Sequence, residues 1–363
     1  MHLSEIIIQR IKDEGPLSFR DFMEMALYYP ELGYYTSARN KIGTDGDYYT
    51  SPDLTPLFGE MIGKQLEQMS YILGEEQPFI IVEYGAGKGH LCHDILDYLK
   101  GNERLYEHLH YCIIEKSPAM QNRERTHLHE KVRWYNSILE LPEVSGCILS
   151  NELVDNFPVH QVIMQDELME VFVDYQDGFI ELYRPATQDL IDYLAELNIT
   201  LEQGFRTEIN LQASQWIKSI AMSLKKGFVL TIDYGDSSSA LYSRSRSCGT
   251  LVCYNNHRIN NALYDDIGQQ DITSHVNFSA LCHWGLKEGL ECCGLTNQAN
   301  FLLALGFGDQ PPNQQTDGQS LMKMVQQQAF LTHTLLVDMG RKYKVLIQKK
   351  GVGKHDLLGL RFS

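Results

Sequence analysis

Glycines and acids gather at one point of the chain, between residues 79 and 91, where a short apolar run ends. The run Phe79–Val82 is rich in β-branched residues, the pattern of a strand buried on both faces of a parallel sheet. Glu83 and a turn of Gly85, Ala86, Gly87, Lys88 and Gly89 follow, and then a helical pattern. Because glycine allows tight turns and close approach of a ligand to the backbone, this predicts the first unit of a nucleotide-binding α/β sheet.

The spacing of the glycines narrows the class of ligand. A dinucleotide fingerprint places its third glycine three residues after the second, where this chain has His90, so a nicotinamide dehydrogenase is disfavoured. The order acid-x-Gly-x-Gly-x-Gly is instead similar to the first motif of S-adenosylmethionine (SAM) methyltransferases. An ordinary strand-to-helix turn stays open as the alternative.

A second acid, Glu115, ends the next apolar run, Leu109–Ile114. An acid at this place can accept hydrogen bonds from both hydroxyls of a ribose. The stretch 100–108 is interpreted as an extended loop, because Glu115 lies further from the glycines than usual. A third strand, 132–135, leads to Asn136 and Ser137, which we expect near an adenine ring.

A fourth strand, 146–150, leads directly into Asn151, Glu152 and, three residues on, Asp155. In a doubly wound sheet the loops that leave the first and fourth strands face the same crevice. We therefore expect these three side chains beside the ligand of the glycine turn. The alternative is structural, since Asp155-Asn156 and Pro158 form turns well and Asn151 could cap a helix.

Hydroxyl and tyrosine side chains precede the sheet in the stretch 46–53, GDYYTSPD. Either Ser51-Pro52 or Thr55-Pro56 supplies the cap and first residue of a helix that reaches about Tyr71. Thr50, Ser51 and Pro52 are predicted to close over the ligand, with a surface turn as the alternative.

Composition excludes several classes of protein. The 363 residues carry a net charge of -16, which argues against a nucleic-acid binder, and no apolar run has the length of a membrane span. The first residues form an amphipathic helix without the features of a targeting peptide, and the eight cysteines are scattered. We expect a cytoplasmic protein with reduced thiols. His257 and His275 lack partners at ligand spacing, so no metal is predicted.

The remaining patterns predict the organisation of the chain. Helices at 3–14 and 18–29, with Ser18 as an N-cap, form an N-terminal helical cap over residues 1–55. The core covers 56–350, with a β-meander and helix inserted at 161–208 and a long polar segment at 236–277, and 351–363 form a tail. Within the core we expect strands at 227–233, 298–305 and 342–348 and a helix at 278–292.

Seven stretches, in order along the chain, resemble the MidA-like family of SAM-dependent methyltransferases, which is related to the mitochondrial complex I assembly methyltransferase. They are GDYYTSPDLTPLFGE (46–60), VEYGAGKGHL (82–91), SNELVDNFPVH (150–160), LTIDYG (230–235), GTLVCYNNH (249–257), QDITSHVNF (270–278) and MGRKYKVL (339–346). The family usually has alanine where this chain has Asn156, and its first motif often has Leu-Gly-Pro or Ile-Gly-Ala where this chain has Tyr84-Gly85-Ala86. The resemblance implies an α/β fold with a Rossmann-like seven-stranded core, an N-terminal helical lobe and an inserted substrate lobe.

The resemblance also implies transfer of a methyl group from SAM to a protein arginine, with a respiratory-complex subunit as one candidate acceptor and a homodimer left open. Glu83, Gly85, Ala86, Gly87, Gly89 and Glu115 would hold SAM, and Thr50, Ser51 and Pro52 would cover it. Glu152, with Asn151 and Asp155, would present the acceptor nitrogen. A small-molecule methyltransferase and a SAM-binding assembly factor without turnover remain alternatives.

Overall fold

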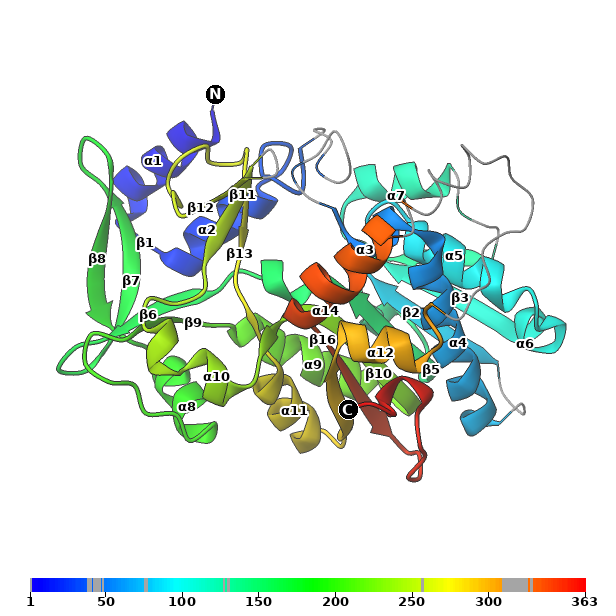
Figure 1. The fold of residues 1–363 in the computed structure, drawn as a ribbon. Helices are drawn as coiled ribbons and strands as arrows, with labels where there is room; N and C mark the ends of the chain where they lie inside the picture. The colour runs from blue at the N-terminus through cyan, green and yellow to red at the C-terminus, as the bar shows by residue number, and fades with distance from the viewer. Residues whose placement is uncertain are drawn as a thin grey trace. The chain divides into compact units, whose positions relative to one another are not determined.

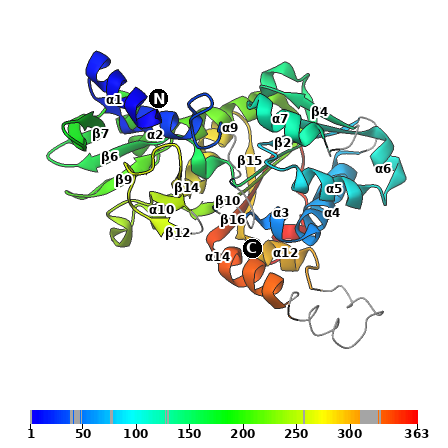
Figure 2. The same cartoon turned by 90° about the horizontal axis from the view of Figure 1, so that it is seen from above.

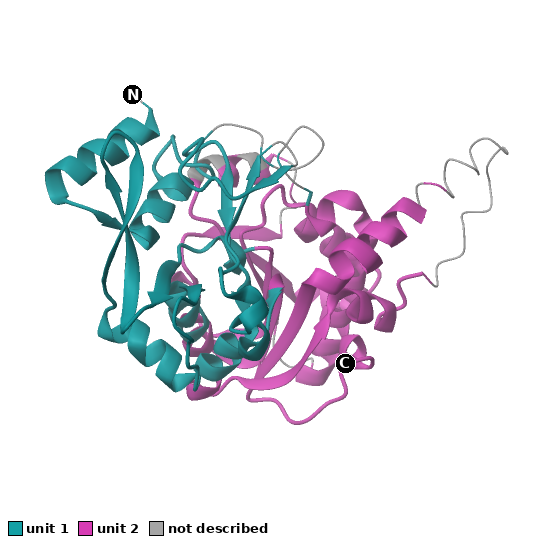
Figure 3. Cartoon of the chain, turned by 60° about the vertical axis from the view of Figure 1, so that its left-hand side comes forward, with its two compact units in different colours: residues 1–49, 153–218, 235–285 teal, residues 50–152, 219–234, 286–363 magenta. Residues whose placement is uncertain are grey.

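The chain folds into two compact units, coloured separately in Figure 3 of this computed structural model. The structure describes residues 2–37, 41, 47, 49–74, 78–126, 128, 131–255, 258–308, 326 and 329–363. Unit 1 consists of residues 1–49, 153–218 and 235–285, and unit 2 consists of residues 50–152, 219–234 and 286–363.

Unit 2 is organised around one mostly parallel sheet (Figure 1). Among the described residues its strands lie in the order β15 (Glu291–Asn297), β16 (Tyr343–Lys350), β10 (Leu224–Asp236), β5 (Val144–Asn151), β2 (Phe79–Tyr84), β3 (Leu109–Ile114) and β4 (Val132–Tyr135). Strands β10 to β4 are parallel, whereas β16 runs antiparallel to both neighbours. The order reverses between β2 and β5, which places the expected ligand crevice at their carboxyl ends. The predicted seven-stranded α/β core is confirmed.

One face of this sheet is covered by α4 (Pro56–Leu73), α5 (His90–Leu99) and α12 (Gln298–Ala304), whose apolar side chains join those of the strands in one core. Figure 2 shows α4 beside α5. They pack closely, since a Cβ on Gly59 would lie 2.4 Å from that of Asp94. The other elements are α3 (Ser51–Leu54), α6 (Glu103–His108), α7 (Pro118–Arg125), α14 (Met339–Lys342), the 3-10 helices at Ile138–Glu140 and Leu358–Leu360, and the π-helix Thr334–Asp338.

Unit 1 combines helices with two antiparallel sheets (Figure 1). The first sheet has the order β1 (Leu17–Ser18), β7 (Leu168–Tyr175), β6 (His160–Met164) and β9 (Arg206–Ile209), with β8 (Phe179–Pro185) also on β7. The second consists of β12 (Arg258–Asn260), β11 (Val252–Asn255) and β13 (Asp271–Thr273). The helices are α1 (Leu3–Glu14), α2 (Phe19–Tyr28), α8 (Gln188–Glu196) and α10 (Ser238–Leu241), with short 3-10 turns at Val154–Asn156 and Arg244–Arg246. Two further helices, α9 (Leu211–Ser223) and α11 (Phe278–Lys287), begin in unit 1 and end in unit 2. The end of β10 pairs with β14 (Val276–Asn277).

The first two helices of unit 1 form where the sequence predicts them. Ser18 caps α2, because its Oγ accepts a hydrogen bond from Asp21 N at 3.1 Å. Apolar residues of both helices, including Ile7 and Phe22, pack with Val171 of β7 in one core.

Three sequence expectations about local structure are wrong. The predicted strand 298–305 is helix α12, because the Asn297 Oδ1 accepts from Asn300 N at 2.8 Å and starts a helix there. The strand is β15, directly before it, where a helix was expected to continue to Cys292. The expected loop 100–108 contains α6, which Asn102 caps.

Replacing Gly146 with alanine should destabilise unit 2 strongly. A Cβ on Gly146 would lie 1.9 Å from Ile80 O on the neighbouring strand, so β2 and β5 would have to separate. We expect a loss of about 3 kcal/mol in the free energy of unfolding, measured by urea denaturation. Gly178→Ala is the matched control, because a Cβ there meets nothing within 4 Å. Equal losses for both variants would contradict this account.

Candidate functional site

The glycine turn between β2 and α5 presents bare backbone. Gly85, Gly87 and Gly89 all have positive φ, of 65°, 59° and 78°, a conformation that glycine adopts without strain. Gly89 N donates to Ala86 O at 2.8 Å, and α5 begins at the next residue. A Cβ on Gly89 would lie 2.9 Å from the side chain of Leu128. The turn therefore has the shape that a ligand packed on main-chain atoms requires.

Glu115 lies at the end of β3, beside this turn. Its Oε1 accepts from Ser117 N at 2.7 Å, and its main-chain oxygen accepts from Gln121 Nε2 at 2.7 Å. Gln121 Nε2 also donates to Asn136 Oδ1 at 3.3 Å, which brings the two residues predicted to contact ribose and adenine to one place. Burial raises the pKa of the Glu115 carboxyl.

Glu83 points into the protein rather than onto the surface of the turn. Its side chain is buried, and Oε2 accepts from the hydroxyl of Tyr111 at 2.8 Å. Burial raises the pKa of this carboxyl to about 7, against the lowering effect of that hydrogen bond. The geometry makes it a support of the glycine turn, and direct contact with a cofactor stays a prediction.

A further buried acid in this region, Glu124 on α7, was missed by sequence reasoning. It is fully buried, and Trp134 Nε1 donates to its Oε2 at 2.5 Å. Burial raises the pKa of Glu124 to about 8, with further contributions from Glu115 and Glu83. The burial of Glu124 could not be predicted from the sequence, because the residues around it in α7 are mostly polar.

The predicted covering segment, Thr50 to Pro52, lies against the glycine turn. It starts the short helix α3, and its neighbour Asp53 reaches the turn: Asp53 Oδ1 lies 3.0 Å from His90 Nδ1 and 3.6 Å from Lys88 Nζ. Sequence reasoning named Thr50, Ser51 and Pro52 but missed the acid that attaches them.

Glu152 lies at the end of β5, on the strand next to β2, and three groups hold its carboxylate. Oε1 accepts from Ser51 N and from Asn151 Nδ2, both at 3.2 Å, and Oε2 accepts from the hydroxyl of Tyr343 at 2.9 Å. Glu152 has a φ of 52°, an uncommon value for a residue other than glycine. The structure thus brings Glu152, Asn151 and Ser51 together, and adds Tyr343, which sequence reasoning missed.

Asp155 belongs to unit 1, whereas Asn151 and Glu152 belong to unit 2. It is buried, and its main-chain oxygen accepts from Ser274 N at 2.9 Å. The carboxyl of Asp271 is close enough that Asp155 contributes, after burial, to raising the pKa of Asp271 to about 8. Tyr35 donates its hydroxyl to Asp271 at 2.9 Å. A role for Asp155 in presenting an acceptor stays a prediction.

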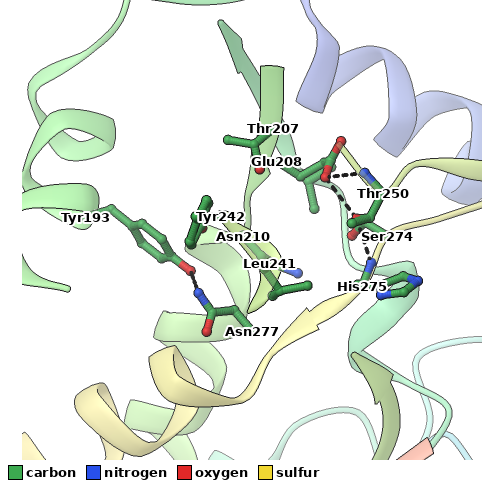
Figure 4. A pocket seen from close by; sticks show the side chains of 11 residues that line it. Tyr193, Thr207, Glu208, Asn210, Leu241, Tyr242, Thr250, Ser274, His275 and Asn277 are labelled. Carbon is green, nitrogen blue, oxygen red and sulfur yellow. Dashed lines mark hydrogen bonds between the residues drawn. The ribbon is translucent and has the colours of Figure 1, made fainter. Parts of the chain in front are cut away.

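A small cavity in unit 1 collects residues from three of the stretches singled out in the sequence. Figure 4 shows Glu208 turned toward Thr250 and Tyr193 toward Asn277. Thr250 N and Oγ1 both donate to Glu208 Oε2 at 2.9 Å. The cavity volume is about 20 Å³, enough for a water molecule and too small for an amino-acid side chain. We therefore do not assign it to the acceptor.

The described residues contain no cluster of three or more histidine, cysteine, aspartate or glutamate side chains placed to hold a metal ion. His275 Nδ1 lies 2.9 Å from Arg246 Nη1, and His257 lies outside the described residues. In the same part of the chain, no helix is long and apolar enough to cross a bilayer.

The strand order, with its antiparallel β16, and the bare glycine turn define the class of a Rossmann-like methyltransferase core. A family described as "Putative S-adenosyl-L-methionine-dependent methyltransferase" matches residues 61–296, more than half of the 363 residues, and this chain belongs to that family. S-adenosylmethionine is therefore its cofactor. The residues fit it, because Gly85 and Gly87 present main chain without a side chain and Glu115 lies at the neighbouring strand end.

Individual relatives agree with this class. The chain is 26% identical over 336 residues to "Protein arginine methyltransferase NDUFAF7 homolog, mitochondrial" of Caenorhabditis elegans, covering 84% of this chain and 76% of that protein. The Drosophila melanogaster protein of the same name is 25% identical over 348 residues, covering 83% and 74%. A crystal structure from Burkholderia thailandensis, a "likely methyl transferase" bound to S-adenosyl-homocysteine, has a TM-score of 0.89 and 29% identity over 99% of this chain and 95% of that one.

These relatives overturn one expectation. The cytoplasmic location predicted from the sequence is wrong by this comparison, because the matching curated proteins are named as mitochondrial. The prediction used the amphipathic character of the first residues as evidence about the compartment. In the structure these residues form α1, whose apolar side chains pack in the core of unit 1, so their pattern reports on packing and not on location.

Glu115→Ala should weaken cofactor binding by about 2 kcal/mol, because it removes charge-assisted hydrogen bonds to the ribose. Calorimetry with S-adenosylhomocysteine measures the change. Glu107→Ala, on the exposed side of α6, removes the same charge and should leave the affinity unchanged. If both variants bind equally well, Glu115 does not contact the ribose.

Glu83→Gln should stabilise the cofactor-free protein, and more so as the pH rises. The pKa of Glu83 is about 7 in the folded state and about 4.5 when unfolded, so the folded state binds more protons between these values and wild-type stability falls across them. The glutamine does not titrate, and the advantage should reach roughly 3 kcal/mol at most above pH 7. Thermal denaturation from pH 5 to 8 checks this. A difference that stays constant with pH would show that the Glu83 pKa is not raised.

Proposed function

We propose that this chain transfers a methyl group from SAM to a guanidine nitrogen of an arginine in a protein substrate, with Glu152 as the carboxylate that receives the guanidinium. The observation that carries the proposal is the held carboxylate of Glu152 at the end of β5, next to the strand that leads into the cofactor turn. Support comes from the curated relatives, which are named protein arginine methyltransferases and are 23–26% identical to this chain.

The chemistry needs a carboxylate more than a strong base. When bound, the cofactor supplies an electrophilic methyl group on a sulfonium. A guanidinium stays protonated in proteins, and a carboxylate that accepts its N–H groups bidentately leaves electron density on the remaining nitrogen. The C–N bond forms as the C–S bond breaks, and the nitrogen then releases a proton.

The surroundings of Glu152 suit this task because its orientation is set before a substrate arrives. Ser51 N and Asn151 Nδ2 hold one oxygen, and Tyr343 holds the other. Preorganised groups do not have to reorient during the reaction, which is the main source of electrostatic catalysis. Asn151 acts in this proposal by orienting Glu152.

The acceptor is identified most directly by mass spectrometry of proteins from a wild-type strain and a deletion strain. We expect at least one arginine that is methylated only in the wild type, with a subunit of a respiratory complex as one candidate acceptor. Loss of a methylated small molecule with no change in protein methylation would favour a small-molecule methyltransferase. Cofactor binding without any S-adenosylhomocysteine release would favour an assembly factor without turnover.

Glu152→Gln should separate binding from chemistry. Glutamine keeps the shape: its Oε1 can still accept from Ser51 N and its Nε2 can donate to the Tyr343 hydroxyl, but it lacks the charge that pairs with a guanidinium. We expect SAM affinity to stay within a few-fold and single-turnover methyl transfer at saturating SAM to fall roughly a hundredfold, the scale of losing one charge-stabilising group.

The matched control for this experiment is Glu143→Gln, an exposed acid just before the same strand, whose ion pair with Lys225 is solvent-accessible. It should leave both quantities unchanged. Near-normal transfer by Glu152→Gln would remove this carboxylate from the mechanism. A parallel collapse of SAM binding would move it into the cofactor site.

A further inference from the structure

Asp53 uses its two carboxylate oxygens for different purposes. Oδ2 accepts from Thr50 Oγ1 at 2.6 Å and from Thr50 N at 3.3 Å, which caps the short helix α3. Oδ1 instead faces the cofactor turn, 3.0 Å from His90 Nδ1 and 3.6 Å from Lys88 Nζ. A residue that only capped its own helix would not need the second set of contacts.

Thr50, Lys88 and His90 stabilise the ionised form of the Asp53 carboxyl. Its side chain is only 7% exposed, and burial by itself would raise its pKa. Hydrogen bonds from His90 and Thr50 and the charge of Lys88 outweigh burial, so the pKa of Asp53 lies below its ordinary value. The carboxylate therefore stays ionised at neutral pH and attracts the cationic side of the turn.

The same segment also contacts Glu152, through Ser51, which lies two residues before Asp53. Ser51 N donates to Glu152 Oε1, and Tyr343 fixes the other oxygen of that carboxylate. The segment Thr50–Leu54 is therefore attached to the glycine turn at one point and to Glu152 at another, with all of these residues in unit 2.

From this arrangement we propose that Asp53 is a positioning residue: it fixes the segment Thr50–Leu54 on the cofactor turn and thereby couples cofactor binding to the orientation of Glu152. The affinity part of this inference needs only the cofactor site, and the rate part rests on the proposed function. Asp53 acts through Lys88, His90 and Ser51 rather than through direct contact with reacting atoms.

Asp53→Asn should weaken binding of S-adenosylhomocysteine about tenfold, because the turn must then be ordered when the ligand binds. The thermal midpoint of the cofactor-free protein should stay within about 2 °C, because the asparagine oxygen can still accept from Thr50 and cap α3. Calorimetry and thermal denaturation measure the two quantities. Asp53→Glu, which keeps the charge, should recover most of the affinity.

A matched control and a double mutant test whether Asp53 affects cofactor binding through its contact with Lys88. Asp97→Asn removes a charge from the exposed side of α5, where Asp97 pairs with Lys100, and should leave the affinity unchanged. Lys88→Met should weaken binding by itself, and Asp53→Asn/Lys88→Met should bind no worse than Asp53→Asn alone, because the two residues act through one contact.

The rate of transfer at saturating SAM tests the coupling to Glu152. Asp53→Asn should lower the single-turnover rate about tenfold even with the cofactor site full. An unchanged affinity would overturn the proposal and leave Asp53 as a cap of α3. A weaker affinity with an unchanged saturated rate would overturn the coupling, and so would a large loss of thermal stability that Asp53→Glu does not repair. Failure of the arginine proposal leaves the affinity results unaffected, which distinguishes the two.

Discussion

One carboxylate, that of Glu152, joins three stretches of chain that are far apart in the sequence. Its donors are Ser51, 101 residues earlier, its neighbour Asn151, and Tyr343, 191 residues later. A buried or half-buried carboxylate left without donors would be costly, so each donor stabilises the loop conformation that the others need. The uncommon backbone conformation of Glu152 persists because these contacts outweigh its strain.

Buried acids distinguish the neighbourhood of the cofactor turn. Glu83 and Glu124 lie in the interior, and burial raises the pKa of each carboxyl by more than the hydrogen bonds from Tyr111 and Trp134 and the nearby charge of Arg125 lower it. Asp53 shows the opposite outcome, because hydrogen bonds from His90 and Thr50 and the charge of Lys88 keep its pKa below the ordinary value. The two outcomes suit different roles: Glu83 and Glu124 lie in the interior, where the protonated carboxyl is favoured, and Asp53 attaches a neighbouring segment by its charge.

The sequence predicted the parts of the site that local pattern controls. Strand 79–82, the glycine turn and Glu115 were found because apolar runs that end in acids or glycine are typical of buried parallel strands. The prediction of a strand at 298–305 was wrong because a short apolar run does not distinguish a strand from a helix. Asn297 caps the N-terminus of α12 and so favours the helix. The contacts of Asp53, Tyr343 and Glu124 could not be predicted, since they depend on tertiary packing and not on spacing.

The attachment of α3 gives the glycine turn and Glu152, both in unit 2, a common element. Asp53 and Ser51 lie two residues apart on this four-residue helix, and one faces the glycine turn while the other donates to Glu152. In our proposal this short helix moves as one piece, so that a shift of the turn on cofactor binding changes the position of Ser51 and with it the orientation of Glu152. Methyl transfer requires the donor and the acceptor to be aligned within a fraction of an ångström, and a shared rigid element achieves this with fewer independent contacts.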